Sequence, residues 1–233
     1  FSCAATSGQA AMTSIATSTA EAVAAELGLA EGAAAREHIN SDRYIGGGNI
    51  EITDVVPGDL LAAGGTIRIG SAVGGDVQVV GGNIRIDGSV HSNVRVVGGN
   101  VVITGNVNGN VLVFGGNLHI EKTATIAGSV LMAGGQVFID GTIMNDLTAQ
   151  GGSVTLNGTV RGNADVRGDS VVVDGTIQKN AVLAAKNLSF GPKAAINGNL
   201  RYWQAAGDVI SGSPVRASSC RFRAARSSSR LRR

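Results

Sequence analysis

The chain has 233 residues, of which 43% are hydrophobic and 3% are aromatic, and 35 are glycine. The apolar residues are mostly Val, Ile, Leu and Ala, and the β-branched members favour pleated strands. No apolar run approaches the ~18 residues that a membrane-spanning helix needs, so we expect no such helix. The two cysteines, Cys3 and Cys220, lie at opposite ends of the chain, which is neither a disulfide framework nor a metal-site spacing.

Residues 1–46 form an Ala/Ser-rich leader. Ile15, Val23 and Leu27 are spaced as on one face of a helix, whereas Gly28 and Gly32 each oppose that helix by about 1 kcal/mol. Two interpretations stay open. The leader is either a helical cap over the exposed edge of the domain that follows it, or a disordered segment.

Residues 47–203 repeat a unit of seventeen residues, since VVGGNIRI at 79–86 returns as VVGGNVVI at 96–103. Two units are longer by two residues at the same point, at 120–126 and 190–196, which marks a loop on one edge of a stacked unit. Paired glycines or their substitutes recur at 47–48, 64–65, 81–82, 98–99, 115–116, 134–135, 151–152, 168–169 and 185–186.

Apolar residues occupy fixed positions in every unit. The columns that begin at Ile50 and Ile52 are apolar throughout and flank a mixed column, which is the period-two pattern of a strand with one buried face. Further apolar columns begin at Val56, Leu60 and Ala62. The sequence therefore predicts three short strands in each unit, separated by turns, with inward side chains on all three.

Two kinds of residue mark the predicted corners. One corner is glycine in several units, and another is polar in every unit. Asn and Asp tolerate left-handed backbone angles and hydrogen-bond their neighbours, so we interpret the polar column as a structural stack rather than a row of ligand sites. This column is Asp59, Asp76, Asn93, Asn110, Ser129, Asp146, Asn163, Asn180 and Asn199.

Repetition at a fixed spacing lets each strand pair with its copy one turn earlier. The predicted fold is therefore all-β, a single-stranded parallel β-helix with three sides and about nine coils over residues 47–203. At ~4.8 Å per coil it is a rod roughly 40 Å long.

Residues 204–233 form an Arg/Ser-rich tail with seven arginines and one acidic residue. Subtracting this +6 from the whole-chain charge of +2 leaves −4 for the first 203 residues. We expect the tail to be disordered and solvated, with binding to anionic lipid or nucleic acid as the alternative. Phe222 is the one aromatic residue among these arginines and no recognised module accompanies them, so no specific nucleic acid is predicted.

Few groups in the sequence are suited to catalysis, and we expect no enzyme, no cofactor and no metal site. His38, His91 and His119 fall in different parts of the chain or coil, and no pair of carboxylates suited to glycoside cleavage emerges. Outward columns in the middle of the rod instead carry exposed apolar residues, which suggest a lateral contact surface. Its candidate residues are Val102, Leu112, Phe114, Leu131 and Phe138.

GDLLAAGGTIRI (58–69), the recurring GGNI and GGNV, and FGPKAAINGNLRYW (190–203) together resemble the bactofilin or polymer-forming cytoskeletal family over about 47–203. The resemblance implies a right-handed, three-sided β-helix in a bacterial protein. Its subunits would join end to end into nonpolar filaments without nucleotide, often at a membrane, where they serve cell shape or wall-related scaffolding. The candidate joint residues are Ile50, Ile52, Leu60, Phe190, Leu200 and Tyr202, to which we add Trp203 of the last coil.

The paired glycines, the leader and the tail differ from compact cytoplasmic bactofilins, and the AAGG style (62–65) resembles exported or envelope-associated relatives, so the side of the membrane stays open. We expect a non-enzymatic scaffold that forms homo-oligomeric filaments through its terminal coils and associates with a membrane or the cell envelope. The alternative is a β-helix module that binds polysaccharide or cell wall with one outer face.

Overall fold

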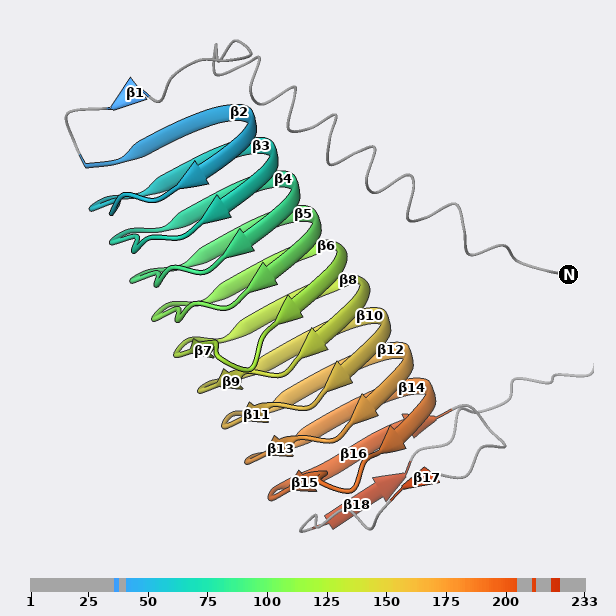
Figure 1. Cartoon of the computed structure of the whole chain (residues 1–233). Helices are drawn as coiled ribbons and strands as arrows, with labels where there is room; N and C mark the ends of the chain where they lie inside the picture. The colour runs from blue at the N-terminus through green and yellow to red at the C-terminus, as the bar shows by residue number, and fades with distance from the viewer. Residues whose placement is uncertain (1–35, 38–40, 205–210, 213–218, 223–233) are drawn as a thin grey trace, which may run out of the picture.

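The computed structural model describes residues 36–37, 41–204, 211–212 and 219–222, and every regular element among them is a β-strand. The strands stack into a straight rod, with β2 near one end and β16 and β18 at the other (Figure 1). The predicted leader and tail lie mostly outside the described residues. Their described parts include β1, the start of β2, β17 and β18.

One long strand and one short strand or bridge make up each coil. The long strands are β2 (Arg43–Ile52), β3 (Leu60–Ile69), β4 (Val77–Ile86), β5 (Val94–Ile103), β6 (Val111–Ile120), β8 (Val130–Ile139), β10 (Leu147–Leu156), β12 (Ala164–Val173), β14 (Ala181–Phe190) and the shorter β16 (Asn199–Gln204). The short strands are β7 (Thr125–Ile126), β9 (Thr142–Ile143), β11 (Thr159–Val160), β13 (Thr176–Ile177) and β15 (Ala195–Ile196). Terminal strands are β1 (Arg36–Glu37), β17 (Ser211–Gly212) and β18 (Ser219–Phe222).

Equivalent residues of successive coils are direct neighbours. Each long strand from β2 to β14 pairs in parallel with the next, so that Ile67 lies between Ile50 and Ile84. The short strands form a second parallel sheet, which isolated bridges such as Val56↔Val73 continue toward the N-terminal end. The predicted parallel β-solenoid with about nine coils of about seventeen residues is confirmed.

Two of the three strands predicted in each unit are one continuous strand. Each ten-residue strand passes through the glycine pair and reverses direction there, so its first and second halves form two sides of the coil and the short strand forms the third (Figure 1). A β-carbon on Gly115 would overlap the carbonyl oxygen of Gly98 in the preceding coil. The closeness of stacked backbones rather than an unusual backbone angle therefore favours glycine at Gly115, whereas Ala185 occupies the equivalent position in β14.

A continuous apolar core fills the rod. Ile69, Ile86, Ile103 and Ile120 follow one another along it, and each is at most 1% exposed. The core contains mainly Val, Ile, Leu and Ala because the inward side chains from the three sides of each coil leave little room for aromatic rings. Each fully buried Leu- or Val-sized side chain contributes about 1.5–3 kcal/mol relative to exposure.

Side chains rather than backbone angles close the polar corner. The Oδ1 atom of Asn93 accepts a hydrogen bond from the backbone N–H of Asn110 at 3.0 Å, and Asn110 Oδ1 accepts one from Ser129 N–H at 2.9 Å. The interpretation of this column as a structural stack is confirmed. No residue of this column uses the left-handed angles that Asn and Asp tolerate, since among the described non-glycine residues only Ser41 has a positive φ, of 52°.

Candidate functional site

The first coil ends the stack on the N-terminal side. β1 pairs antiparallel with β2 only through Arg36↔Tyr44 and Glu37↔Arg43. In the described part of the chain, residues 45–52 of β2 therefore have a strand partner on one side only. Tyr44 and Val55 are 40% and 67% exposed on this coil. An open strand edge beside exposed apolar side chains is a template for another strand.

The C-terminal end continues the same parallel arrangement. β16 pairs with β14 on one side and with β18 on the other, and β17 pairs with the end of β14. β17 and β18 thus lie within the segment predicted as a tail and extend the stack. Trp203, in β16, is 52% exposed.

Most of the predicted joint residues point into the core. Ile50, Ile52, Leu60, Phe190 and Leu200 are at most 6% exposed, and Leu60 and Phe190 belong to coils next to the terminal ones. Tyr202 is half-buried against the core. Of the predicted set, Trp203 alone presents a largely exposed side chain. An end-to-end joint would therefore use backbone edges and exposed residues around them.

Sequence reasoning missed Tyr44 and Val55. Val55 lies in a column that is polar or small in other coils, where Ser89 is its equivalent, whereas the column of Tyr44 also contains Leu112 and Leu131. A large apolar residue that interrupts a polar or small column on a terminal coil is a signal that could have identified Val55, whereas the column of Tyr44 gave no such signal.

The predicted lateral residues do not form one patch. Leu112 and Leu131 project from the first halves of β6 and β8, whereas Val102 and Phe138 belong to second halves, on another side of the coil. Phe114 lies next to the bend. Leu131, Phe138 and Phe114 are 39%, 38% and 40% exposed, and Val102 and Leu112 are half-buried. The rod thus carries two separate apolar strips.

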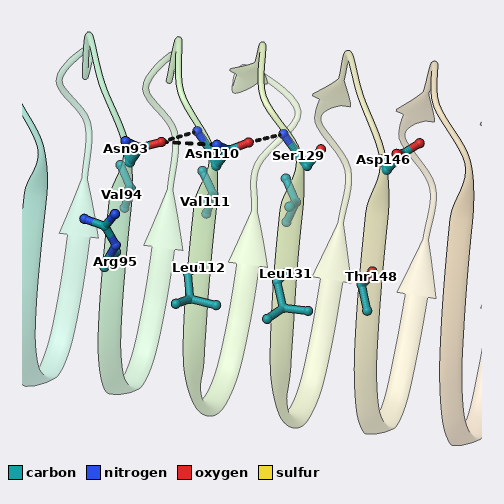
Figure 2. A pocket seen from close by; sticks show the side chains of 11 residues that line it. Asn93, Val94, Arg95, Asn110, Val111, Leu112, Ser129, Leu131, Asp146 and Thr148 are labelled. Carbon is teal, nitrogen blue, oxygen red and sulfur yellow. Dashed lines mark hydrogen bonds between the residues drawn. The ribbon is translucent and has the colours of Figure 1, made fainter.

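The strip of Leu112 and Leu131 borders a groove of about 290 Å³ beside the polar corner. Figure 2 shows Asn93, Asn110, Ser129 and Asp146 in a row along its upper rim and both leucines below them. At this rim the ladder is interrupted, because no hydrogen bond joins the short side chain of Ser129 to Asp146 in the part of the chain that the structure describes.

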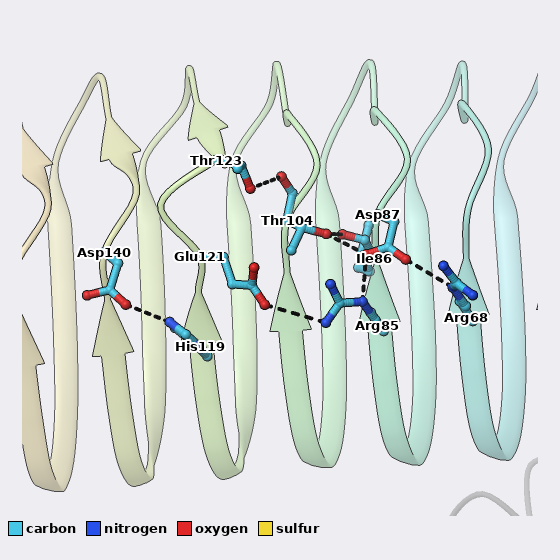
Figure 3. A network of polar contacts seen from close by, with 9 residues as sticks. All are labelled: Arg68, Arg85, Ile86, Asp87, Thr104, His119, Glu121, Thr123 and Asp140. Carbon is cyan, nitrogen blue, oxygen red and sulfur yellow. Dashed lines mark hydrogen bonds and ion pairs between the residues drawn. The ribbon is translucent and has the colours of Figure 1, made fainter.

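The other strip, of Val102 and Phe138, lies in one column with Arg85 and His119. Figure 3 shows the row of charged residues to which these two belong. Asp87 is at its centre and accepts hydrogen bonds from Thr104 Oγ1 at 2.6 Å and from Arg68 Nε at 3.0 Å, while Arg85 Nε lies 2.7 Å from it. Burial raises the pKa of Asp87, but these hydrogen bonds and the two arginine charges outweigh burial, so its pKa is below the ordinary value.

Farther along this row, His119 Nε2 lies 2.7 Å from Asp140 Oδ2, and its ring meets Phe138 edge to face at a centroid distance of 6.0 Å. Asp140 also accepts a hydrogen bond from Asn157 at 2.7 Å. These polar side chains hydrogen-bond to one another along the stack, which is typical of residues with a structural role.

The described residues were searched for groups that could bind a metal ion or cross a membrane. Within the described residues, no group of three or more His, Cys, Asp or Glu side chains could hold a metal ion. The same residues include no helix with the length and apolar character needed to cross a membrane.

Residues 119–208 match the family model of bactofilins, described as polymer-forming cytoskeletal. The resemblance drawn from the repeat is thereby confirmed over the C-terminal coils. Comparisons with curated proteins and with solved structures gave no match. The bactofilin family is a bacterial family of structural, cytoskeletal proteins, and together with the solenoid fold the match supports a polymer-forming scaffold.

Proposed function

We propose that this chain is a non-enzymatic scaffold whose subunits assemble end to end through the edges of their terminal coils. The observation that carries the proposal is the edge of β2 at residues 45–52, which has a strand partner on one side only among the described residues. Every coil inside the rod uses both edges. A strand from a second subunit that adds to this edge would extend the same ladder.

Exposed side chains at the ends are too few to form the joint by themselves. Burying Tyr44, Val55 and Trp203 would contribute at most about 1.5–3 kcal/mol each. Association costs an estimated 4–15 kcal/mol in lost freedom of motion. The backbone ladder and the fit of one coil on another must therefore supply the rest, which favours joints that copy the stacking inside the rod.

The working unit in this proposal is the β-helix of residues 47–203, flanked by the leader 1–46 and the tail 204–233. We place the filament at a bacterial membrane or cell envelope, which is supported by the bactofilin match and the Ala-rich and Arg-rich flanks. Co-sedimentation of the full chain with vesicles of neutral or anionic lipid tests this placement, and recovery in the supernatant with both vesicle types would contradict it.

Sedimentation velocity of the full chain across a concentration series tests the assembly. The double variant Tyr44→Lys/Val55→Lys places charge on the open edge and should keep the chain monomeric where the wild type forms long species. The matched control is Val97→Lys/Leu131→Lys, at sites that are 41% and 39% exposed in the middle of the rod. Loss of assembly in the control alone would overturn end-to-end joints in favour of lateral contact.

A second candidate function is binding of polysaccharide or cell wall through the strip around Phe138. It is favoured by an aromatic ring that is 38% exposed beside the polar pair His119 and Asp140. In a pull-down with insoluble cell-wall glycan, Phe138→Ala should then release the protein, whereas Val182→Ala, at another exposed position, should not. Equal retention of both variants would contradict this candidate.

A further inference from the structure

One side of the rod carries most of its exposed apolar side chains. This side, called here the first-half side, consists of the outward residues in the first halves of the long strands, in two columns that begin at Tyr44 and Gly46. The outward columns of the second halves hold mainly amide, hydroxyl and charged residues. Of the eight exposed large apolar residues in the described part of the chain, six lie on the first-half side: Tyr44, Val97, Phe114, Leu131, Val182 and Trp203.

The two columns of the first-half side are complementary in size within single coils. Three coils place a large residue in the first column and an alanine in the second. A second copy that exchanged the two columns would set each of these large side chains against an alanine, as the close packing of two sheets requires. The three combinations are Leu61 with Ala63, Leu131 with Ala133, and Val182 with Ala184.

The charged residues of this side are complementary in the same way. Asp165 and Arg167 occupy the two columns in β12, with Asp165 Oδ2 2.8 Å from Arg167 Nη2 and both side chains solvent-accessible. Arg201 and Trp203 occupy them in β16, and Arg201 makes no ion pair within the residues that the structure describes. After the same exchange, Asp165 would face Arg167 of the second copy, and Arg201 would face its Trp203 in a cation–π contact.

The groove beside Leu112 and Leu131 offers space for a ring on this side. It has a volume of about 290 Å³ and is lined by Arg95 as well, which an ion pair of 2.8 Å with Asp76 holds at the polar corner (Figure 2). Phe114 occupies the second column in the same coil as Leu112 and is 40% exposed. When the columns exchange, Phe114 of the second copy lies opposite Leu112, at the edge of the groove.

We infer that two subunits pack side by side through their first-half sides, with their rods parallel and each coil against its own copy. A two-fold axis along the rods gives this arrangement, because it exchanges the two columns and keeps every coil at the same height. A fully overlapping antiparallel pair would instead set the charged residues of β12 against a different coil. The inference goes beyond end-to-end assembly and does not depend on it. Tyr44 belongs to this side as well as to the first coil, so Tyr44→Lys/Val55→Lys should weaken both contacts.

The size of the first-half side suits a second copy. Its ten strands at ~4.8 Å, with four residues of each at ~3.3 Å, give a flat area of roughly 600 Å². A standard interface buries ~800 Å² on each partner, and projecting side chains add to the flat area. A lipid surface would cover an apolar side equally well, but it gives no reason for the match between the two columns.

Exchange of charge on β12 tests the inference in the full chain. Asp165→Arg makes both columns of that coil basic, and Arg167→Asp makes both acidic, so each variant alone brings like charges together across the axis. We expect the dissociation constant of the lateral pair to rise about tenfold or more for each variant. An equimolar mixture should restore pairing, because unlike chains then face each other. Sedimentation velocity and particle width in electron microscopy measure pairing, and circular dichroism establishes that both variants keep the fold.

Each outcome of this experiment bears on a different proposal. Pairing that is lost in each variant and restored in the mixture supports the parallel pair. Equal pairing in the wild type and in both variants would overturn it, since β12 would then not face its own copy. Long wild-type filaments of single-rod width would overturn it and leave end-to-end assembly intact, whereas short particles two rods wide would do the reverse. A single rod at every concentration would contradict both.

Leu131→Lys provides a second test with a matched control on the same strand. Leu131 and Gln136 are both exposed on β8, but Gln136 lies beyond the bend and outside the first-half side. Leu131→Lys should reduce the particles to single-rod width, and Gln136→Lys should keep the paired width. Equal widths for the two variants would contradict the inference. A wild type of single-rod width that loses its co-sedimentation with anionic vesicles on Leu131→Lys would identify a lipid surface as the occupant and overturn it.

Discussion

The bend at the glycine pair and the polar corner both turn the chain, but they do so by different means. At the bend, Gly115 has no side chain because a β-carbon would overlap the oxygen of Gly98. At the polar corner, Asn110 accepts a hydrogen bond from the next coil at 2.9 Å through its side chain. The bend depends on the lack of a side chain, and the polar corner depends on a side chain that accepts a hydrogen bond.

The difference teaches that a stack of coils can be held in register by shape at one corner and by hydrogen bonds at another. A substitution at the bend should act through steric overlap, which requires the stacked backbones to shift. At the polar corner, a substitution removes one hydrogen bond near solvent, where water can replace part of it. We therefore expect larger effects at the bend.

The largest effect is expected for Gly115→Ala, which adds a β-carbon against the preceding coil. Overpacking of this kind costs about 1–3 kcal/mol in the free energy of unfolding. Gly48→Ala is the control, since no atom lies within 4 Å of the added carbon in the first coil. Denaturant unfolding below the assembly concentration measures both, and equal stability of the two variants would contradict the steric account.

Asn110→Ala should have a smaller effect. It removes the acceptor for the N–H of Ser129 and leaves that group to water, at a cost of about 1 kcal/mol. Asn108→Ala is a suitable control, because its contact with His91 at 3.3 Å is an exposed side-chain pair. The comparison fails if both substitutions lower the unfolding midpoint equally.

The interrupted ladder offers a substitution that should stabilise. Ser129→Asn places a longer side chain where its oxygen can accept the N–H of Asp146, as Asp146 itself does for Asn163 at 2.7 Å. The gain should be about 0.5–1 kcal/mol, the usual net value of one hydrogen bond. Thr148→Asn, on the neighbouring strand, should give no gain in a thermal melt.

The smallest effect concerns pH. The N–H of Asn93 donates to Asp76 at 2.9 Å and, with Arg95 at 2.8 Å, lowers the pKa of that carboxyl below 3.8. A lowered pKa in the folded state contributes stability above the ordinary pKa, and this stability is lost as the pH falls through 3.8 and then the lower folded-state value. Asp76→Asn keeps the acceptor and removes the titration.

Unfolding midpoints between about pH 6 and about pH 2.5 should therefore fall less steeply for Asp76→Asn than for the wild type. Identical slopes would show that the ladder carboxylate has the same pKa in the folded and unfolded chain.

Much of the fold could be predicted from the sequence because the core is periodic. Ile86 and Ile103 recur at one register position, and residues that stack on their own copies must share an environment. Asn93 and Asn110 could be placed at a corner for the same reason. The continuous strand through Gly98 could not be predicted, because a glycine pair reads as a turn unless the closeness of the next coil is known.

The candidate surfaces were less predictable, since they depend on position along the rod rather than on the repeat. Leu112 and Phe138 both occupy outward columns, but the reversal at the bend places them on different sides. Tyr44 shares its outward column with Leu131, which is equally exposed in the middle of the rod, so the column alone does not single out the first coil. The repeat predicts the features that stacked coils have in common. It does not predict the surface of a terminal coil, which differs from the others in its neighbours.

Electron microscopy of the full chain over a concentration series tests the central claim most directly. End-to-end joining predicts particles of one constant width whose length increases with protein concentration. Particles of single-subunit length at every concentration, or particles that grow in width while keeping that length, would contradict it.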